Sequence, residues 1–361
     1  MPTLRLDRDF WRNRRVFVTG HTGFMGGWLC LWLNRLGARV AGYALAPGTR
    51  PSLFDTVGLA DRMCSVIADV RDAERLTATM TDFAPDIVMH LAAQPLVGLA
   101  HTAPVETYAV NVMGTVNVMQ AMRHCPQVRA AVIVTTDKVY ENREWPWGYR
   151  ESDTLGGHEP YGSSKACAEL VVDAYHRDYF SGDRRIGIAT VRAGNIIGGG
   201  DWAANRLLPD AARAFAQRRP LAIRNPESIR PWQHVVDPVR GYMALAERLA
   251  AEPDTWSGPW NFGPAEADAW PVGQIADEVA RLWGEDARWI RPVPRAGADV
   301  AKESGVLVLS SAKAQAQLGW SPVWRIQRAL TATVDWYKAQ ITGRDMNAFT
   351  LDQIAVAEGA N

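Results

Sequence analysis

A tyrosine and a lysine one helical turn apart are the first residues in this chain whose spacing suggests catalysis. Tyr161 and Lys165 lie in the segment YGSSKACAEL, and an i, i+4 spacing places both side chains on one face of a helix. A lysine ammonium favours a nearby phenolate and so lowers the pKa of the tyrosine. Tyr161 could then accept the proton of an alcohol while hydride leaves the same carbon. The motif by itself is common, so its meaning depends on the surrounding elements.

A second candidate pair, Asp137 and Lys138, follows the apolar run AAVIV in the segment TTDKVYEN. Elimination of water requires an acid for the leaving hydroxyl and a base for the departing proton. An acidic and a basic side chain at the end of a buried strand could supply both. The alternative is a mutual salt bridge at a loop entrance. The presence of Tyr161 and Lys165 downstream favours the catalytic interpretation.

A glycine-rich turn could bind the diphosphate of a dinucleotide. In VTGHTGFMGGWL, Gly20, Gly23 and Gly26 separate a β-rich run from an apolar helical pattern. A helix N-terminus offers free N–H groups and a partial positive charge, and glycines let the backbone approach the phosphates. The spacing is G-x-x-G-x-x-G rather than G-x-G-x-x-G, and an ordinary tight turn is the alternative. Its place in the first strand–turn–helix unit favours cofactor binding.

The choice between NAD and NADP is open at this level. The second predicted strand ends in GYALAPG, without an acidic residue for a ribose hydroxyl. Arg50 could meet a 2′-phosphate, but an exposed loop arginine is the more ordinary interpretation. Asp69 ends the next strand, where a carboxylate could bind an adenine amino group or simply face solvent.

The elements that must position these residues alternate between strand and helix. Strands are predicted at residues 14–20, 38–45, 63–70, 85–94, 128–136 and 185–195, and helices at 26–37, 74–84, 104–125 and 161–180. Strands that are apolar throughout and separated by amphipathic helices indicate a parallel sheet covered on both faces. The fold class is therefore α/β, a Rossmann-type doubly wound parallel sheet with a smaller mixed C-terminal domain.

The pattern changes near residue 195, where Gly, Pro and Trp become frequent and the elements shorten. Residues 1–194 are predicted to form the cofactor-binding domain, to which residues 235–262 return. Residues 195–234 and 263–345 are predicted to form a substrate domain. Residues 346–361 have weak patterning and are predicted to be a fraying tail.

Composition limits the partners of the protein. Lys+Arg and Asp+Glu both number 39, so no net charge draws the chain to nucleic acid or to a membrane surface. The four cysteines lack metal-type or redox-type spacing, which indicates no metal site and a reducing compartment. The charged first residues do not resemble a secretory signal, and no run reaches the length of a membrane span. We expect a cytoplasmic protein.

Several motifs together resemble one family. TGHTGFMG, HLAAQ, NVMGT, TTDKVYEN, YGSSK and RAGNIIGGGDW resemble the extended short-chain dehydrogenase/reductases, and within them the nucleotide-sugar 4,6-dehydratases, in particular those acting on CDP-glucose. The resemblance implies a Rossmann domain with tightly bound, recycled NAD and a C-terminal domain for a nucleotide sugar. It also implies a homodimer formed through the helices near residues 104–124 and 161–180.

The resemblance assigns a reaction and roles. Tyr161 would take the proton of the sugar 4-hydroxyl as hydride passes from C4 to NAD, water would leave across C5 and C6, and hydride would return to C6. Thr136 would bind the 4-oxygen, and we assign Asp137 as the acid for the leaving hydroxyl and Lys138 as the base at C5. The cofactor set is Gly20, Thr22, Gly23, Phe24, Met25, Gly26, Asp69, Val70, Leu91, Ala92, Ala93, Asn111, Tyr161 and Lys165, and the substrate set is Gln94, Asn195, Arg206, Arg230 and His234.

Three segments depart from the family pattern and leave the sugar and nucleotide open. Met25 stands where a lysine is usual, GLAH at 98–101 replaces a stretch with Arg, Ser and Tyr, and residues 301–314 replace a His-Glu-Ala type segment. An epimerase, or a 4,6-dehydratase for a dTDP-, GDP- or UDP-sugar, is the main alternative. A non-catalytic NAD(P)-binding regulator ranks lower, because such proteins tend to lose the Tyr–Lys pair.

Overall fold

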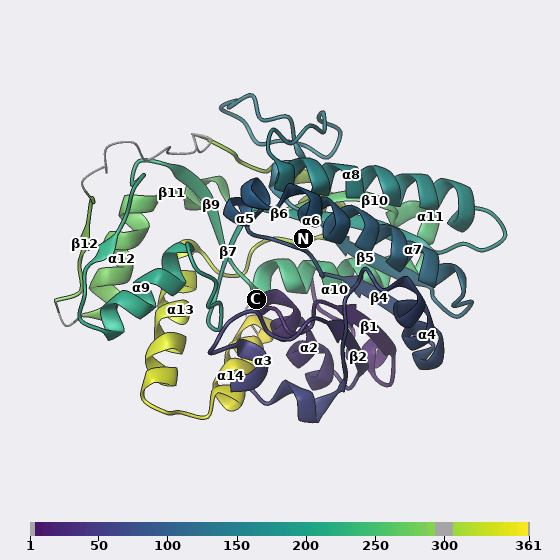
Figure 1. Ribbon diagram of the computed structural model, residues 1–361, viewed down its shortest axis with the longest axis horizontal. Helices are drawn as coiled ribbons and strands as arrows, with labels where there is room; N and C mark the ends of the chain where they lie inside the picture. Colours follow the sequence, from purple (N-terminus) through teal and green to yellow (C-terminus); the bar gives the residue numbers. More distant parts are fainter. Residues whose placement is uncertain (1–3, 285, 293–305, 360–361) are drawn as a thin grey trace.

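The computed structural model describes residues 4–284, 286–292 and 306–359. Within these residues seven parallel strands form the main sheet in the order β10-β6-β5-β4-β1-β2-β3 (Figure 1). The strands are β1 Arg15–Thr19, β2 Arg39–Ala44, β3 Cys64–Ile67, β4 Ile87–His90, β5 Ala130–Val134, β6 Gly187–Ala193 and β10 Gly258–Phe262. This topology confirms the predicted fold class.

The sheet is covered on both faces, which explains why its central strands are apolar throughout. On one face α2 (Phe24–Arg35) and α10 (Val236–Ala251) pack against alternate residues of the strands, such as Val18 and Val132. On the other face α4 (Ala73–Phe83), α7 (Gly114–Arg123) and α8 (Pro160–Tyr175) pack against Phe17 and Ala131. Figure 1 shows α4, α7 and α8 grouped on one side of the sheet.

Two predicted helices contain a π-helical turn. The segment predicted at 104–125 consists of α6 (Pro104–Tyr108), the π turn η2 (Ala109–Met113) and α7. The segment predicted at 161–180 consists of α8 and the π turn η4 (His176–Phe180). Such turns occur frequently at functional sites, and η2 carries Asn111, one of the predicted cofactor residues.

The smaller part of the molecule is built on short strands. β7 (Asn195–Ile197), β9 (Ile229–His234) and β11 (Ala269–Pro271) form one sheet, and β8 (Leu221–Ala222) pairs with β12 (Trp289–Ile290). The helices α9 (Leu207–Ala216), α12 (Val272–Trp283) and α13 (Ile326–Ile341) lie against them (Figure 1). The remaining short elements are α1 Arg8–Trp11, α3 Leu53–Thr56, η1 Leu59–Arg62, α5 Val97–Thr102, η3 Asp137–Val139, α11 Pro253–Trp256, η5 Glu266–Asp268 and η6 Ala314–Leu318.

The C-terminal segment corrects one prediction. The expected tail instead forms helix α14 (Met346–Gly359), which packs against α2 and α13. Trp32 Nε1 donates to Glu358 Oε1 at 2.9 Å, and Trp336 Nε1 donates to Thr350 Oγ1 at 2.9 Å. The buried face of the helix includes the polar Thr350 and Gln353, whereas the apolar Val356 is 45% exposed. The sequence therefore lacks the one-sided apolar pattern that marks a surface helix. None of the helices in the described ranges is long and apolar enough to cross a membrane.

Candidate active site

The turn after β1 leaves no room for a side chain at its key glycines. Gly20 has φ +78°, and a Cβ on it would lie 2.7 Å from the Ala92 backbone nitrogen. A Cβ on Gly26 would lie 2.1 Å from the Gly20 carbonyl oxygen. Both distances are shorter than real contacts, so the glycines are required for the close approach of strand and helix.

Helix α2 presents its N-terminus at this turn. Gly23 is the N-cap and provides no side-chain cap, so the N–H groups of the first turn, including those of Phe24 and Met25, are available to an anion. Thr22 Oγ1 donates to the Leu45 carbonyl at 2.8 Å and fixes the turn against the end of β2. The backbone therefore fits a dinucleotide diphosphate. Because this contact uses main-chain groups, methionine in place of lysine at position 25 leaves it intact.

Asp69 and Val70 follow β3, at the same edge of the sheet as the glycine turn. Asp69 accepts a bidentate contact from the Arg71 guanidinium, with Nη2 to Oδ2 at 2.5 Å and Nε to Oδ1 at 3.0 Å. Arg71 lowers the pKa of Asp69, so this half-buried carboxylate remains an ionised acceptor. Val70 packs against Gly114, where a Cβ would lie 2.7 Å from Val70 Cγ1.

A loop after β4 is fixed by side chains of the π turn and of the β1 end. The amides of Leu91 and Ala92 both donate to Thr19 Oγ1 at 3.1 Å. The amide of Gln94 donates to Asn111 Oδ1 at 2.8 Å. Asn111 Nδ2 donates in turn to Ser164 Oγ at 2.9 Å. Asn111 therefore connects the loop that contains Ala93 to helix α8.

The end of β5 carries the predicted acid–base residues. Asp137 is 5% exposed and accepts a hydrogen bond from Thr136 Oγ1 at 3.0 Å. Burial raises the pKa of Asp137, while the charges of Lys138 and Arg230 and the Thr136 hydroxyl oppose that rise. The charge of Lys138 acts on Asp137, but the hydrogen bond of the Asp137 carboxylate within the described residues comes from Thr136. A buried carboxyl with a raised pKa suits proton donation.

Helix α8 brings Tyr161 and Lys165 to the same place. The Thr136 hydroxyl is close enough to Tyr161 to lower the pKa of the phenol, and Lys165 Nζ donates to the Val134 carbonyl at 2.9 Å. Burial raises the pKa of Tyr161 to about 12, against the effects of Thr136 and Arg206. Burial lowers the pKa of Lys165 to about 8. Lys165 Nζ is directed at a β5 carbonyl in this structure, and a lowering of the tyrosine pKa by Lys165 stays a prediction.

The start of α8 depends on a residue that sequence reasoning missed. Glu159 is the N-cap, and its carboxylate accepts from the amides of Tyr161 at 2.7 Å and of Gly162 at 2.8 Å. Pro160 occupies the first helical position, where its missing N–H costs nothing. The available sequence signal was Pro160, because proline is common at the first helical position, whereas glutamate is not among the usual N-cap residues.

Two of the predicted substrate arginines face the catalytic residues. Arg206 is the N-cap of α9, donates to Asp201 Oδ2 at 3.0 Å, and acts electrostatically on Tyr161. Arg230 on β9 is half-buried and acts electrostatically on Asp137. Gly194 precedes Asn195 and leaves space between β9 and the acid, because a Cβ on it would lie 3.1 Å from Asp137 Oδ2.

Two other predicted substrate contacts are corrected. His234 is fully buried, and its ring packs 5.5 Å from the Trp28 ring and 4.5 Å from the Trp324 ring. It therefore belongs to the core between α2 and the small domain. The Gln94 side chain is used within its own loop, where Nε2 donates to Thr107 Oγ1 at 2.9 Å and Oε1 accepts from the Leu96 amide at 2.7 Å. The departure at residues 301–305 lies outside the described residues.

Residues 16–258 match the family model of the NAD dependent epimerase/dehydratase family. The chain belongs to this family. It is 49% identical over 345 residues to a CDP-glucose 4,6-dehydratase of Salmonella typhimurium, covering 94% of this chain and 95% of the relative.

Solved structures of similar proteins share the fold. A UDP-glucose 4-epimerase from Thermus thermophilus in complex with NAD is 25% identical, with a TM-score of 0.74, covering 90% of this chain and 99% of that one. A dTDP-glucose 4,6-dehydratase from Streptomyces venezuelae with NAD bound is 24% identical, with a TM-score of 0.76, covering 91% and 98%. The family therefore includes both dehydratases and epimerases on one scaffold.

One buried ion pair of this family member was also missed. Arg192 on β6 and Glu169 on α8 have side chains 3% and 5% exposed, with Nε to Oε1 at 2.9 Å. An arginine inside an apolar strand was the available signal, since a charge buried on both faces requires a partner.

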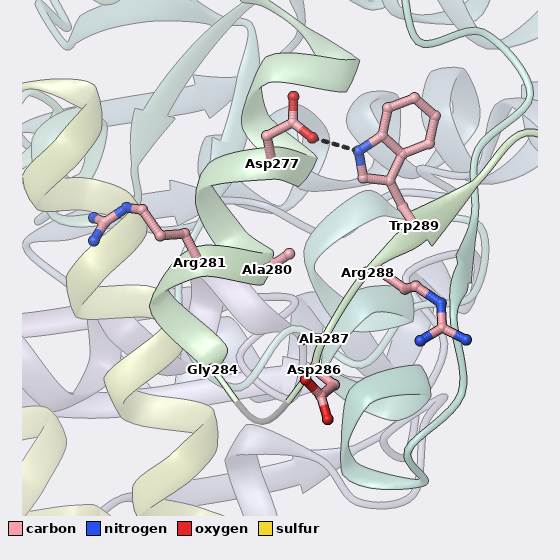
Figure 2. Close-up of a pocket in the computed structure, with 8 residues that line it drawn as sticks. All are labelled: Asp277, Ala280, Arg281, Gly284, Asp286, Ala287, Arg288 and Trp289. Carbon is pink, nitrogen blue, oxygen red and sulfur yellow. Dashed lines mark hydrogen bonds between the residues drawn. The ribbon is translucent and has the colours of Figure 1, made fainter.

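A hollow elsewhere on the surface carries none of the predicted site residues. It has a volume of about 420 Å³ and lies beside α12 and β12 (Figure 2). Trp289 Nε1 donates to Asp277 Oδ1 across it at 2.7 Å. Figure 2 shows the charged side chains of Arg281 and Arg288 directed away from each other. With no convergent polar groups, the hollow does not resemble a built ligand site.

Proposed function

We propose that this chain is an NAD-dependent nucleotide-sugar 4,6-dehydratase acting on CDP-glucose. The observation that carries the proposal is the cluster at the end of β5, where the buried Asp137 and Thr136 adjoin Tyr161. An epimerase needs a proton acceptor at one carbon only, whereas loss of water also needs an acid and a base. The identity of 49% to a CDP-glucose 4,6-dehydratase supports the same substrate.

The cofactor would lie along the edge formed by the ends of β1, β3 and β4. The first-turn amides of α2 would hold the diphosphate, Asp69 the adenine amino group, and Asn111 the loop beside the nicotinamide. When bound at this edge, NAD would supply the hydride acceptor and donor that an oxidation and a later reduction of the sugar need. Lys165, one helical turn from Tyr161, would face the nicotinamide ribose.

Tyr161 would accept the proton of the sugar 4-hydroxyl. The phenolate is unfavourable in this buried position, as the raised pKa of about 12 indicates. The Thr136 hydroxyl and the charge of Arg206 both favour the ionised form. Thr136 can also donate to the 4-oxygen as it becomes a ketone.

Asp137 would protonate the leaving C6 hydroxyl, and Lys138 would take the C5 proton. Burial raises the pKa of Asp137 and so increases its protonated fraction. Lys138 is half-buried and lies on the same short helix η3. Arg206 and Arg230 would bind the diphosphate, because a guanidinium matches phosphate oxygens in bidentate geometry, and Asn195 would contact the sugar.

Incubation with CDP-, dTDP-, UDP- and GDP-glucose, followed by chromatographic separation and mass spectrometry, tests this function. We expect loss of one water from CDP-glucose and no loss from the other three. A second chromatographic peak of unchanged mass would indicate an epimerase. Dehydration of another nucleotide sugar at a higher kcat/KM would retain the reaction and correct the substrate.

The family resemblance and the exposed side chains of α6, η2 and α8 support a homodimer. Val105 is 83% exposed, Met113 52% and Leu170 62%, although all three are apolar. The helices that carry them contact one another on a single chain, and such a patch marks an interaction surface. Light scattering of the wild type and of Leu170→Glu should give a dimer and a monomer; two equal masses would exclude this interface.

A further inference from the structure

The Glu169 carboxylate accepts four hydrogen bonds, two of them from Arg192. Glu169 Oε1 accepts from Thr135 Oγ1 at 2.6 Å and from Arg192 Nε at 2.9 Å. Its Oε2 accepts from Thr190 Oγ1 at 2.5 Å and from Arg192 Nη2 at 3.0 Å. Both carboxylate oxygens are therefore used twice, which fixes the orientation of the side chain.

The pair holds the catalytic segment at both of its ends. Thr135, bound to Glu169, lies two residues before Asp137. Tyr140, two residues after Lys138, accepts from Arg192 Nη1 at 2.7 Å through its hydroxyl. The same hydroxyl donates to Asn261 Oδ1 on β10 at 2.8 Å. The segment that carries Asp137 and Lys138 is thus tied on either side to one ion pair.

The same pair also holds helix α8, which carries Tyr161, the residue proposed to take the proton of the 4-hydroxyl. Glu169 lies four residues after Lys165, on the face of α8 that meets the sheet. Lys165 Nζ donates to the Val134 carbonyl, directly before Thr135 in the chain. Helix α8 and the end of β5 are therefore joined through Lys165 and Glu169, which both point at the same strand.

An apolar pair would satisfy the packing of α8 at lower cost. Buried ion pairs stabilise little compared with well-packed apolar residues of similar volume, because both charges are removed from water. Directional hydrogen bonds differ from apolar packing in fixing angles and register. Glu169 accepts four hydrogen bonds, and the pair contacts Thr135 before Asp137 and Tyr140 after it. We infer that the pair fixes the position of this segment rather than adding stability.

We propose that Glu169 and Arg192 are positioning residues that set Asp137 and Lys138 against Tyr161 and Lys165. This inference rests on the proposed dehydration. In this proposal Tyr140 fixes the chain just after Lys138. Asp137 and Lys138 then lie against the same sugar whose 4-hydroxyl proton Tyr161 accepts. A misplacement of about 1 Å can cost roughly 10²-fold in rate.

Tyr140→Phe tests the proposal because it removes one hydroxyl and leaves the ion pair. Oxidation at C4 should continue while elimination slows about tenfold or more. Reduced cofactor should then accumulate on the enzyme after CDP-glucose is added, measured by its near-ultraviolet absorbance. Tyr149→Phe is the matched control, because the Tyr149 ring stacks on Tyr140 at 5.1 Å. Its hydroxyl bonds the Asn142 side chain and the Arg143 amide and has no bond to Arg192. Equal accumulation in both variants, or none in Tyr140→Phe, would overturn the proposal.

A double substitution separates positioning from stability. Arg192→Met alone leaves a buried carboxylate without its partner, so the melting temperature should fall. Glu169→Leu combined with Arg192→Met should recover the melting temperature but not kcat, which should stay about 10²-fold below wild type. Recovery of both quantities would mean that the pair is only structural.

The proposed dehydration and the positioning role would be contradicted by different results. If wild-type protein leaves the mass of CDP-glucose and of the other nucleotide sugars unchanged, the proposed dehydration is wrong. If wild-type protein dehydrates a nucleotide sugar and the Tyr140→Phe enzyme does so at the wild-type rate without accumulating reduced cofactor, only the positioning role is wrong.

Discussion

The ends of β1 and β5 lie at the same edge of one sheet but are built in opposite ways. At the β1 end main-chain groups form the surface, and neither Gly20 nor Gly26 has room for a Cβ. The β5 end is made of side chains, where Thr136 and Asp137 are buried and hydrogen-bonded to each other. The first region should therefore be sensitive to added volume and the second to lost protons and charges.

The side-chain region should give the largest effect when its proton acceptor is removed. Tyr161→Phe is expected to lower kcat by roughly 10²–10⁴-fold, the usual contribution of general acid–base catalysis. Bound NAD, measured after denaturation of the purified protein, should stay at the wild-type level. Loss of the cofactor together with activity would place Tyr161 in binding rather than in proton transfer.

Asp137→Asn separates the two chemical steps at the same strand end. Asparagine keeps the size of the side chain but cannot donate a carboxyl proton, so elimination should slow by roughly 10²-fold. Oxidation at C4 should be much less affected, and reduced cofactor should build up. Rapid-mixing absorbance checks this, and an equal loss of oxidation rate would exclude Asp137 as the acid of elimination.

The backbone region should respond to a single methyl group. In Gly26→Ala the new Cβ meets the Gly20 carbonyl at 2.1 Å, so the turn must open, at a cost of about 1–3 kcal/mol or more. Both the melting temperature and the bound NAD should fall. Gly182→Ala is the control, because a Cβ at that exposed glycine meets nothing within 4 Å. Wild-type NAD content in Gly26→Ala would contradict the assignment of this turn.

A smaller effect, on the pH dependence of stability, is expected from His234 in the core between α2 and the small domain. Burial lowers the pKa of His234 to about 3 from an ordinary 6.5. The unfolded chain therefore binds a proton below about 6.5 that the folded chain refuses, so stability is full above that pH and is lost as pH falls toward 3. His234→Phe should reduce the fall in melting temperature between pH 7 and pH 5. An unchanged slope would show that His234 contributes nothing to acid sensitivity.

Local sequence predicted most of the backbone region. The glycine spacing, the strand before it and the helix after it are neighbours in the chain, and the structure has β1 and α2 in the predicted order. The Tyr161 and Lys165 pair was likewise visible, since an i, i+4 spacing fixes a helix face. Sequence was sufficient where the relevant contacts are short-range.

Long-range packing explains what was missed. His234 was assigned to the substrate, but its burial depends on Trp28 and Trp324, which come from distant elements. Glu169 and Arg192 each carried a signal as a charge among apolar residues, yet their partnership exists only once α8 lies on β6. Helix α14 was taken for a tail because polar residues such as Gln353 lie on its buried face and Val356 is exposed, which removes the apolar periodicity that predicts a helix.

The contact of α14 with α2 has a consequence for synthesis. Trp32 and Glu358, joined at 2.9 Å, are 326 residues apart in the chain. At an elongation rate of about 5–20 residues per second, roughly 16–65 s separate the synthesis of the two. Helix α2 therefore leaves the ribosome early, and Trp32 lacks its Glu358 partner until helix α14 has been synthesised. A chaperone that shields apolar surface should bind nascent chains of this protein until that late helix has emerged.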